Sequence, residues 1–403
     1  MKRQITEISI KNNEEVSAKL IFKYLKEKKI IYIKSLYDAL NESLNPIDFD
    51  QPAVILNSSG SKNKPRKCLH AISNLNKSAN ASGLWLEEQG FILDNCIIFN
   101  TLPLNHISGF MALWRSKKWG CKYINISPKL IKETEVLFKR TISSKKDNQK
   151  KFITSLVPTQ LNRLISDKYG LKWLKLFDLV WVGGASISNE TAYKCIKEEI
   201  NLAPCYGTTE TAAMVSTLKP KDFLKGNINA GEILKDVELR INTNGLIEIK
   251  SKRLGMELYN SKLKDFKNKK GWWESGDLGE LIKINQINYL KIKGRIDNAF
   301  NSGGETIFPE NIKRRLDDFI YNRNIPIYHL IISKVKDEYW GFRLEIILFF
   351  ETNIDNNSAN EYIALLKEFS KNWARYEKPL RWIIQDKKFL INQELKSNWK
   401  NIN

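Results

Sequence analysis

Three short polar segments of the sequence carry residue types that bind phosphates, metal ions and sugars. The first, Ser58–Arg66, reads Ser-Ser-Gly-Ser-Lys-Asn-Lys-Pro-Arg and follows an apolar run. Glycine and small hydroxyl residues let backbone N–H groups converge on an anion, while lysine and arginine add positive charge. The segment matches neither common glycine-rich nucleotide loop, so a solvated basic turn is the alternative interpretation.

The second segment is Tyr206–Thr211, which reads Tyr-Gly-Thr-Thr-Glu-Thr. An aromatic ring can stack on a base, glycine permits close approach of a phosphate, and a carboxylate can hold Mg²⁺ beside substrate phosphates. The alternative is a polar turn that caps a following helix. The third segment, Ser275-Gly276-Asp277, places one carboxylate on a predicted tight turn, where it can accept hydrogen bonds from ribose hydroxyls.

Alternating strand and helix patterns must position the first two segments. Residues 1–50 start on a polar helical pattern and then show helical spacing at Ile21, Tyr24, Leu25, Ile33, Leu36 and Leu40. Further along, apolar runs predict strands at 52–56, 96–100, 152–157 and 177–182, and helices are predicted at 71–89 and 159–165. Pro158 suits the first turn of a helix, where its missing N–H is not needed. This alternation predicts an α/β lobe with a largely parallel sheet.

The pattern changes after residue 225. The Asn244-Gly245 pair predicts a hairpin between strands 237–241 and 246–249. A second antiparallel pair is predicted at 278–284 and 287–292. A helix at 309–320, strands at 327–333 and 344–350, a helix at 360–376 and a strand at 381–384 complete the prediction. We place a boundary near Arg295–Asp297, which gives domains 1–295 and 296–403.

Composition limits the classes of function. The net charge is +20 over 403 residues, but the lysines are spread along the chain and no recognised nucleic-acid module accompanies them. A basic surface would still attract anionic small molecules. The five cysteines and three histidines show no zinc-binding spacing. A polar N-terminus and short apolar runs predict a cytoplasmic protein without a membrane segment.

Taken in order, the three segments resemble motifs of the adenylate-forming superfamily, which includes acyl-CoA synthetases, luciferases and peptide-synthetase adenylation domains. Ser58–Arg66 is similar to its phosphate loop, Tyr206–Glu210 to its Tyr-Gly-x-Thr-Glu motif, and Gly271–Asp277 to its Gly-Trp-x-x-Thr-Gly-Asp motif. Gly294–Asp297 and Ser302–Glu310 resemble its hinge and the glycine-rich segment after it. The resemblance covers most of the chain and implies a large N-terminal α/β lobe with a small mobile α+β C-terminal domain.

Within the superfamily, Leu102–Gly109, Arg115-Ser116 and Gly120 resemble the o-succinylbenzoate–CoA ligases most, as do Val157–Leu161 and Val182–Ala185. That resemblance implies AMP-forming ligation of o-succinylbenzoate to CoA in menaquinone or phylloquinone synthesis. Two alternatives remain open. One is a ligase for another aryl or fatty acid, and the other is a catalytically decayed nucleotide-binding homologue.

The resemblance assigns roles to individual residues. Catalysis would use Lys396, Glu210, Thr209 and His106, with Glu210 as the Mg²⁺ ligand. ATP and CoA would be bound by Ser58, Ser59, Gly60, Ser61, Lys64, Tyr206, Gly207, Thr208, Asp277, Arg295, Gly303 and Gly304. The acyl substrate would be bound by His106, Ser108, Gly109, Arg115, Gly183 and Gly184. Arg115 would attract a carboxylate of the dianionic substrate, and a surface arginine is the alternative. A homo-oligomer is left open.

The sequence departs from the family pattern in two places. Lys62 and Asn63 replace the second threonine and second glycine of the phosphate loop. Near the C-terminus, Leu395 precedes Lys396 where glycine is usual. Three neighbouring lysines compete for the catalytic role: Lys387, Lys388 and Lys400.

Overall fold

The computed structural model describes residues 2–10, 14–35, 44–58, 66–143, 150–284, 286–350 and 354–385. The chain divides into two compact units. The first is formed by Met1–Ile187, Thr191–Ser275 and Glu280–Ile292. The second is formed chiefly by Lys293–Asn403 and also includes Ser188–Glu190 and Gly276–Gly279. Within the described residues, no helix combines the length and the apolar character needed to cross a membrane.

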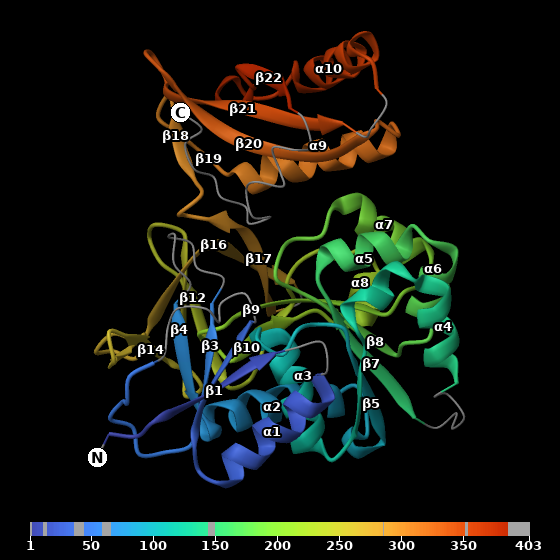
Figure 1. The fold of residues 1–403 in the computed structure, drawn as a ribbon. Helices are drawn as coiled ribbons and strands as arrows, with labels where there is room; N and C mark the ends of the chain where they lie inside the picture. The colour runs from blue at the N-terminus through green and yellow to red at the C-terminus, as the bar shows by residue number, and fades with distance from the viewer. Residues whose placement is uncertain are drawn as a thin grey trace. The chain divides into compact units, whose positions relative to one another are not determined.

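An 11-stranded sheet runs through the described part of the first unit (Figure 1). Its strands are, in spatial order, β12 (Val237–Ile241), β13 (Leu246–Ser251), β16 (Trp273–Ile284), β17 (Ile287–Arg295), β11 (Glu232–Ile233), β10 (Ala213–Thr217), β9 (Leu202–Thr208), β8 (Leu179–Val182), β7 (Lys151–Leu156), β5 (Cys96–Asn100) and β6 (Lys122–Asn125). The neighbours from β9 to β6 pair in parallel, whereas β10 pairs antiparallel with both β9 and β11. The predicted parallel sheet is therefore one half of a mixed sheet.

A second sheet of the same unit has six described strands. They are β1 (Ile5–Ile10), β2 (Ile30–Ser35), β3 (Ala53–Asn57), β4 (Lys67–Ala71), β14 (Met256–Tyr259) and β15 (Lys262–Asp265). The helices of the unit are α1 (Glu14–Lys26), α2 (Ile72–Glu87), α3 (Ile107–Trp119), α4 (Thr134–Ile142), α5 (Pro158–Ile165), α6 (Lys168–Leu174), α7 (Asn189–Lys197) and α8 (Pro220–Leu224). Short 3₁₀ turns lie at Leu93–Asn95 and Pro128–Lys132.

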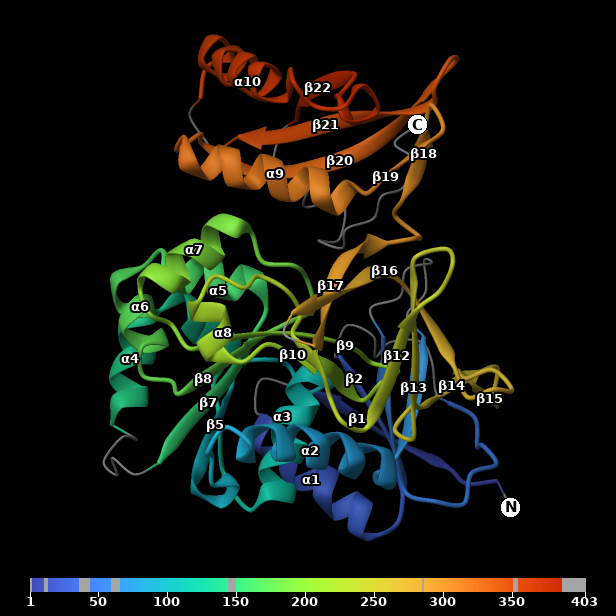
Figure 2. The same ribbon diagram turned by 180° about the vertical axis from the view of Figure 1, so that it is seen from behind.

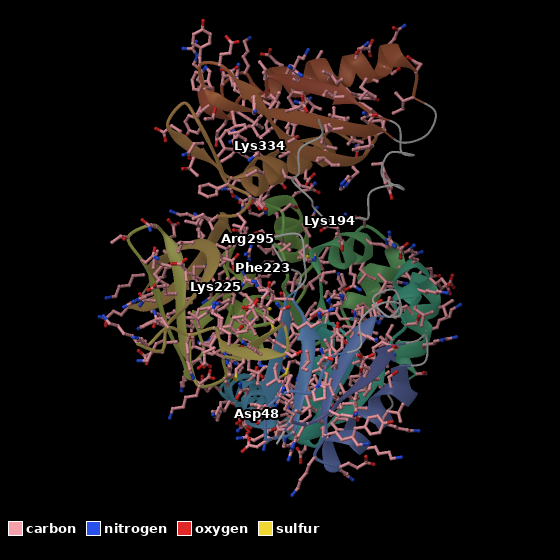
Figure 3. All side chains as sticks on the ribbon, turned by 60° about the vertical axis from the view of Figure 1, so that its left-hand side comes forward. Asp48, Lys194, Phe223, Lys225, Arg295 and Lys334 are labelled. Carbon is pink, nitrogen blue, oxygen red and sulfur yellow. The ribbon has the colours of Figure 1, made fainter. Side chains whose placement is uncertain are left out.

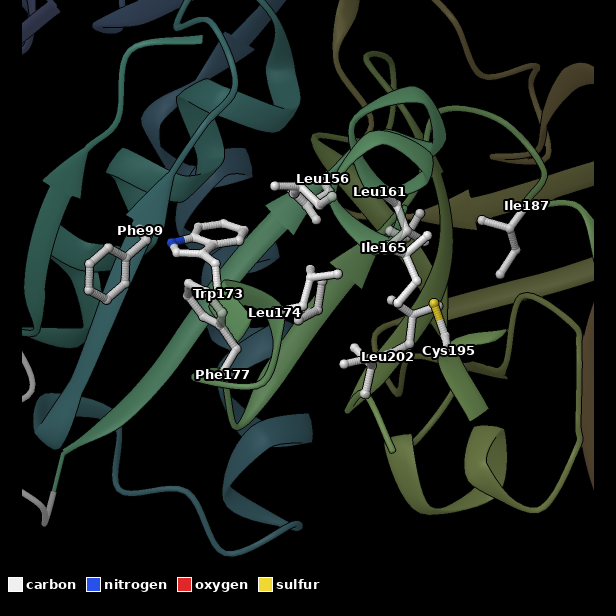
Figure 4. Close-up of a cluster of buried hydrophobic side chains, with 14 of the residues drawn as sticks. Phe99, Leu156, Leu161, Ile165, Trp173, Leu174, Phe177, Ile187, Cys195 and Leu202 are labelled. Atoms are coloured by element: carbon white, nitrogen blue, oxygen red, sulfur yellow. The ribbon is translucent and has the colours of Figure 1, made fainter. Parts of the chain in front are cut away.

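The central parallel strands β5, β7 and β8 are mostly apolar and buried because helices cover both faces of the sheet there. Alternate residues of each strand enter different cores: Phe99 packs with α5 and α6, while Ile98 packs with α2 and α3 (Figures 1 and 2). The first of these cores centres on Trp173 and Phe177, whose rings meet edge to face with centroids 4.5 Å apart (Figure 4). This two-sided burial fixes the carboxyl ends of the strands, where ligands bind in open α/β sheets.

The second unit has its own core under a sheet in the order β20 (Ile327–Asp337), β21 (Gly341–Phe350) and β22 (Arg381–Ile384). Its other elements are the hairpin β18 (Phe300–Ser302) and β19 (Glu305–Ile307), α9 (Pro309–Asn322), α10 (Asn356–Ser370) and a 3₁₀ turn at Arg375–Glu377. The predicted pairing of 327–333 with 344–350 is confirmed and extends further at the turn that joins the two strands.

Three local predictions are wrong. Ile33 lies in buried strand β2, and β1 occupies the start of the chain, where a polar helical pattern was predicted. The predicted helix 360–376 ends at Ser370, because the chain turns there and the Trp373 N–H donates to the Ser370 carbonyl at 3.1 Å. Asp277 lies inside β16 and not on a tight turn.

Candidate active site

The ends of β3 and β4 flank the predicted phosphate loop on its two sides. These strands pair antiparallel up to Asn57 and Lys67. Beyond them the Ser58 N–H donates to the Arg66 carbonyl at 2.8 Å, and the Arg66 N–H donates to Ser58 Oγ at 3.3 Å. Ser58 is therefore buried at the base of the loop. Residues 59–65 of the predicted loop lie outside the described residues, and they include four of the predicted ATP-binding residues: Ser59, Gly60, Ser61 and Lys64.

The Tyr206–Thr211 motif occupies the end of β9 and the turn into β10. The predicted alternative, a turn that caps a helix, is wrong because a strand follows. A side chain at Gly207 would place its Cβ 2.2 Å from the Ala213 carbonyl oxygen, so only glycine fits this register. Thr211 ties the turn together, since its Oγ1 accepts from the Thr208 N–H at 3.0 Å and donates to the Ala213 carbonyl at 2.6 Å.

The backbone carbonyl groups of Thr209 and Glu210 accept hydrogen bonds from two residues that the sequence did not single out. His70 is fully buried in β4, and its Nε2 lies 2.7 Å from the Thr209 carbonyl oxygen. A carbonyl oxygen only accepts, so Nε2 must carry the proton. Burial lowers the pKa of His70 to about 4, although the bond to Thr209 opposes this shift. The Gly255 N–H donates to the Glu210 carbonyl at 2.9 Å.

The Glu210 carboxylate is buried, and among the described residues it has no hydrogen-bond or ion-pair partner. The described part of the chain also has no group of three His, Cys, Asp or Glu side chains suited to a metal ion. A single unengaged carboxylate suits Mg²⁺, which takes most of its other ligands from phosphates and water. Glu210 therefore fits the predicted role.

The predicted acyl-site residues lie at or beyond the carboxyl ends of the parallel strands. His106 is exposed immediately before α3, and Ser108 is half-buried in the first turn of that helix. Gly109 packs so closely that a Cβ would lie 2.2 Å from the Pro103 carbonyl oxygen. Gly183 and Gly184 follow β8, and a Cβ on Gly183 would lie 2.9 Å from Cys205 Sγ of the neighbouring strand β9. Gly183 thus permits close packing where the strands end, whereas Gly184 has a positive φ of 88° that favours glycine.

Arg115 is not a surface residue, so the alternative interpretation of this side chain is wrong. It is 3% exposed, and its guanidinium lies 5.1 Å from the centre of the Trp181 ring. Nε donates to Ser82 Oγ at 3.0 Å, whereas Nη2 has no hydrogen-bond partner among the described residues. Burial lowers the pKa of Arg115 to about 10, so the group remains charged at neutral pH.

The second unit holds the remaining described candidates. Arg295 ends β17 (Figure 3) and bonds two carboxylates, with Nη1 2.9 Å from Asp277 Oδ1 and Nη2 3.2 Å from Asp297 Oδ2. Gly303 and Gly304 form the turn of the β18–β19 hairpin, both with positive φ. A Cβ on Gly303 would lie 2.3 Å from the Trp340 ring. Lys396 and its competitors Lys387, Lys388 and Lys400 lie outside the described residues.

Cysteine chemistry has no support in the structure. All five cysteines are free thiols. Burial raises the pKa of Cys68 well above its usual value, and it raises the pKa values of the other four to about 12, namely those of Cys96, Cys121, Cys195 and Cys205. Nucleophilic cysteines need a lowered pKa, so these thiols have packing roles.

Comparisons with known proteins agree with this arrangement. The sequence model of the family described as AMP-binding enzyme matches residues 3–249. A 2-succinylbenzoate–CoA ligase of Listeria monocytogenes is 27% identical over 350 residues, which make up 86% of this chain and 68% of that protein. The ligase of the same name from Escherichia coli K12 is 26% identical over 288 residues, which make up 70% of this chain and 54% of that protein.

Solved structures show the same fold. An o-succinylbenzoate CoA synthetase from Bacillus subtilis in complex with ATP and magnesium ion matches with a TM-score of 0.68 at 18% identity, covering 95% of this chain and 86% of that chain. The complex of that enzyme with the acyl-adenylate intermediate matches with a TM-score of 0.67 at 19% identity, covering 94% and 79%. The predicted adenylate-forming fold, with mixed α/β sheets and a large N-terminal part, is confirmed.

Proposed function

The chain belongs to the AMP-binding enzyme family, and within that family we propose that it joins o-succinylbenzoate to CoA through an acyl-adenylate. In the first half-reaction, a carboxylate oxygen of the acid attacks the α-phosphorus of ATP, and pyrophosphate leaves. In the second, the CoA thiolate attacks the acyl carbon, and AMP leaves with the electron pair of the broken C–O bond. The thioester would serve quinone synthesis. The free thiols suit a reducing compartment, so we place the reaction in the cytoplasm.

The observation that carries the substrate proposal is the buried Arg115. A guanidinium removed from water without a carboxylate partner is costly, and an anionic ligand would offset that cost. Among the described residues, no carboxylate pairs with Arg115, and its Nη2 lacks a hydrogen bond. o-Succinylbenzoate has two carboxylates, so one can react while the other binds a cation. A simple aryl or fatty acid would leave Arg115 without a counter-ion.

The chain's own residues position the reacting groups, and displacement at phosphorus depends on such positioning and on charge neutralisation. Glu210 would hold Mg²⁺, which neutralises phosphate charge when bound. The Thr209 hydroxyl and the backbone at Gly207 and Thr208 would contact phosphates, while Tyr206 would stack on adenine. From the family resemblance we assign the ribose to Asp277 and Arg295, the pantetheine path to Gly303 and Gly304, and the catalytic cation to Lys396.

The test uses the purified chain with ATP, Mg²⁺, CoA and o-succinylbenzoate, read by mass spectrometry of the thioester and by pyrophosphate release. We expect o-succinylbenzoyl-CoA to form, with benzoate and decanoate much poorer substrates. The variant Glu210→Gln tests the predicted Mg²⁺ ligand. It should lower adenylate formation by roughly a hundredfold or more, as loss of one transition-state stabiliser does. Equal turnover of a monocarboxylate would refute the substrate assignment. Failure with every acid would indicate a decayed homologue.

A further inference from the structure

A buried chain of hydrogen bonds connects Arg115 to a second buried arginine. Arg253 lies between β13 and β14, is fully buried, and donates from Nη1 to Ser78 Oγ at 3.2 Å. Ser78 and Ser82 are one turn apart on the same face of α2. Ser82 Oγ accepts from Arg115 Nε at 3.0 Å and donates to the Ser78 carbonyl at 2.9 Å. One face of α2 therefore holds both guanidinium groups.

Each serine hydroxyl in this chain does the same two things. It accepts from a guanidinium and donates its single proton to a backbone carbonyl. The carbonyl bonded by Ser78 Oγ, at 2.5 Å, belongs to Ala212 in the turn that follows Glu210. A hydroxyl used as both acceptor and donor has a fixed orientation. Arg115 is consequently held in place by its bond to Ser82.

The charges of the cluster do not balance among the described residues. Asp236 forms an ion pair with Arg253, with 3.3 Å between Oδ2 and Nε. No second carboxylate pairs with Arg115, and Nη2 of each arginine lacks a hydrogen bond within the described part of the chain. Two buried guanidiniums and one carboxylate leave one positive charge, and the charge of Arg253 adds to burial in lowering the pKa of Arg115. An anion beside Arg115 would relieve this repulsion as well as the desolvation cost.

We infer that Arg253 and Ser82 are positioning residues that hold Arg115 for the carboxylate of the substrate that does not react. The inference rests on the proposed function, because it assumes that the substrate has a second carboxylate. Arg253 contributes in two ways: it anchors Ser78 of the same helix face, and it adds positive charge to the cluster. Ser82 contributes through geometry alone, because it is neutral.

The experiment compares two acids that share one skeleton. o-Succinylbenzoate carries a ring carboxylate, and 4-oxo-4-phenylbutanoate lacks only that group. For each acid, kcat and KM are measured in wild type, Ser82→Ala, Arg253→Lys and the double variant Arg253→Met/Asp236→Asn, in which the Asp236 carboxylate is neutralised together with its partner. Ser73→Ala is the control, since Ser73 is an exposed serine of the same helix.

We expect Ser82→Ala to raise the KM for o-succinylbenzoate by roughly tenfold, as loss of a hydrogen bond to a charged group does. It should leave the KM for 4-oxo-4-phenylbutanoate and for ATP nearly unchanged. The double variant should show a larger increase in the KM for o-succinylbenzoate than Ser82→Ala does, and no comparable increase for 4-oxo-4-phenylbutanoate. Arg253→Lys should have a KM for o-succinylbenzoate between those of wild type and the double variant, because lysine keeps the charge but not the forked geometry.

Equal loss of activity toward both acids in the Ser82→Ala and double variants would overturn the inference, since a purely structural role predicts that result. Unchanged KM values in both variants would overturn it as well. The proposed function fails separately: wild-type protein would then show no preference for the diacid over 4-oxo-4-phenylbutanoate. Melting temperatures of all variants show whether a change in KM reflects unfolding.

Discussion

At the scale of single residues, the side chains that were predicted are those that would meet ligands, and those that were missed lie behind them. Glu210 and Arg115 belong to short motifs that are contiguous in the sequence. His70 contacts Thr209, 139 positions away, and Arg253 contacts Ser78, 175 positions away. Only the fold reveals such partners. The one available signal was a histidine within the short run Cys68-Leu69-His70-Ala71, directly after the predicted phosphate loop.

His70 makes stability depend on pH in a specific interval. Its pKa is about 4 in the folded protein and about 6.5 when exposed. Well above pH 6.5 His70 is neutral in both states and does not change the unfolding free energy. As pH falls from 6.5 to 4, the unfolded chain binds a proton that the folded protein excludes. The unfolding free energy therefore drops, by roughly 3 kcal/mol once both states are protonated.

Urea unfolding of wild type and His70→Gln at pH 7.5 and pH 5 measures this effect. Glutamine does not titrate and can still donate toward Thr209. Wild type should lose roughly 2 kcal/mol more stability than the variant between the two pH values. Identical losses would contradict the lowered pKa, because they would mean that His70 binds its proton at the same pH in the folded and the unfolded protein.

At the scale of elements, apolar runs predicted three of the five parallel strands, β5, β7 and β8, because both faces of the sheet are buried there, whereas β6 and β9 were not predicted. β5 has its predicted bounds, and α5 starts at Pro158. The N-terminal prediction failed for a physical reason: short apolar runs do not distinguish a strand from a helix, and Ile33 gains its burial by pairing with neighbouring strands. The early end of α10 was also invisible, since neither glycine nor proline marks it.

The packing of α3 against the segment before it gives a prediction for Gly109. A Cβ there would lie 2.2 Å from the Pro103 carbonyl oxygen and 2.4 Å from that of Leu102, so backbone must move. Gly109→Ala should destabilise the protein by at least about 2 kcal/mol and should weaken binding of the acid, because α3 also carries Arg115. Lys117→Ala, an exposed change on the same helix, is the control.

Thermal unfolding and the KM for o-succinylbenzoate report the two effects of Gly109→Ala separately. Normal stability together with normal KM would show that α3 moves freely relative to Leu102 and Pro103. Such freedom would contradict the close packing described above.

At the scale of the whole molecule, the two half-reactions make different demands on the catalytic lysine. If Lys396 neutralises charge while pyrophosphate leaves, Lys396→Ala should abolish adenylate formation but still convert supplied o-succinylbenzoyl-adenylate to the thioester. Lys387→Ala and Lys388→Ala are matched controls, and we expect both to keep both half-reactions. Rapid-quench timing of each half-reaction decides the matter. Wild-type adenylation in Lys396→Ala would assign the role to another residue.

The buried thiols have a practical consequence for studying such a two-step enzyme. Alkylating dyes react with thiolates, and cysteines with a pKa of about 12 are almost entirely protonated at pH 7. The native chain should therefore stay unlabelled by maleimide, without removal of any cysteine. An introduced thiol such as Tyr339→Cys, at a side chain 93% exposed, would then take up a fluorophore selectively. Fluorescence spectroscopy could follow the second unit through a catalytic cycle in an otherwise unmodified enzyme.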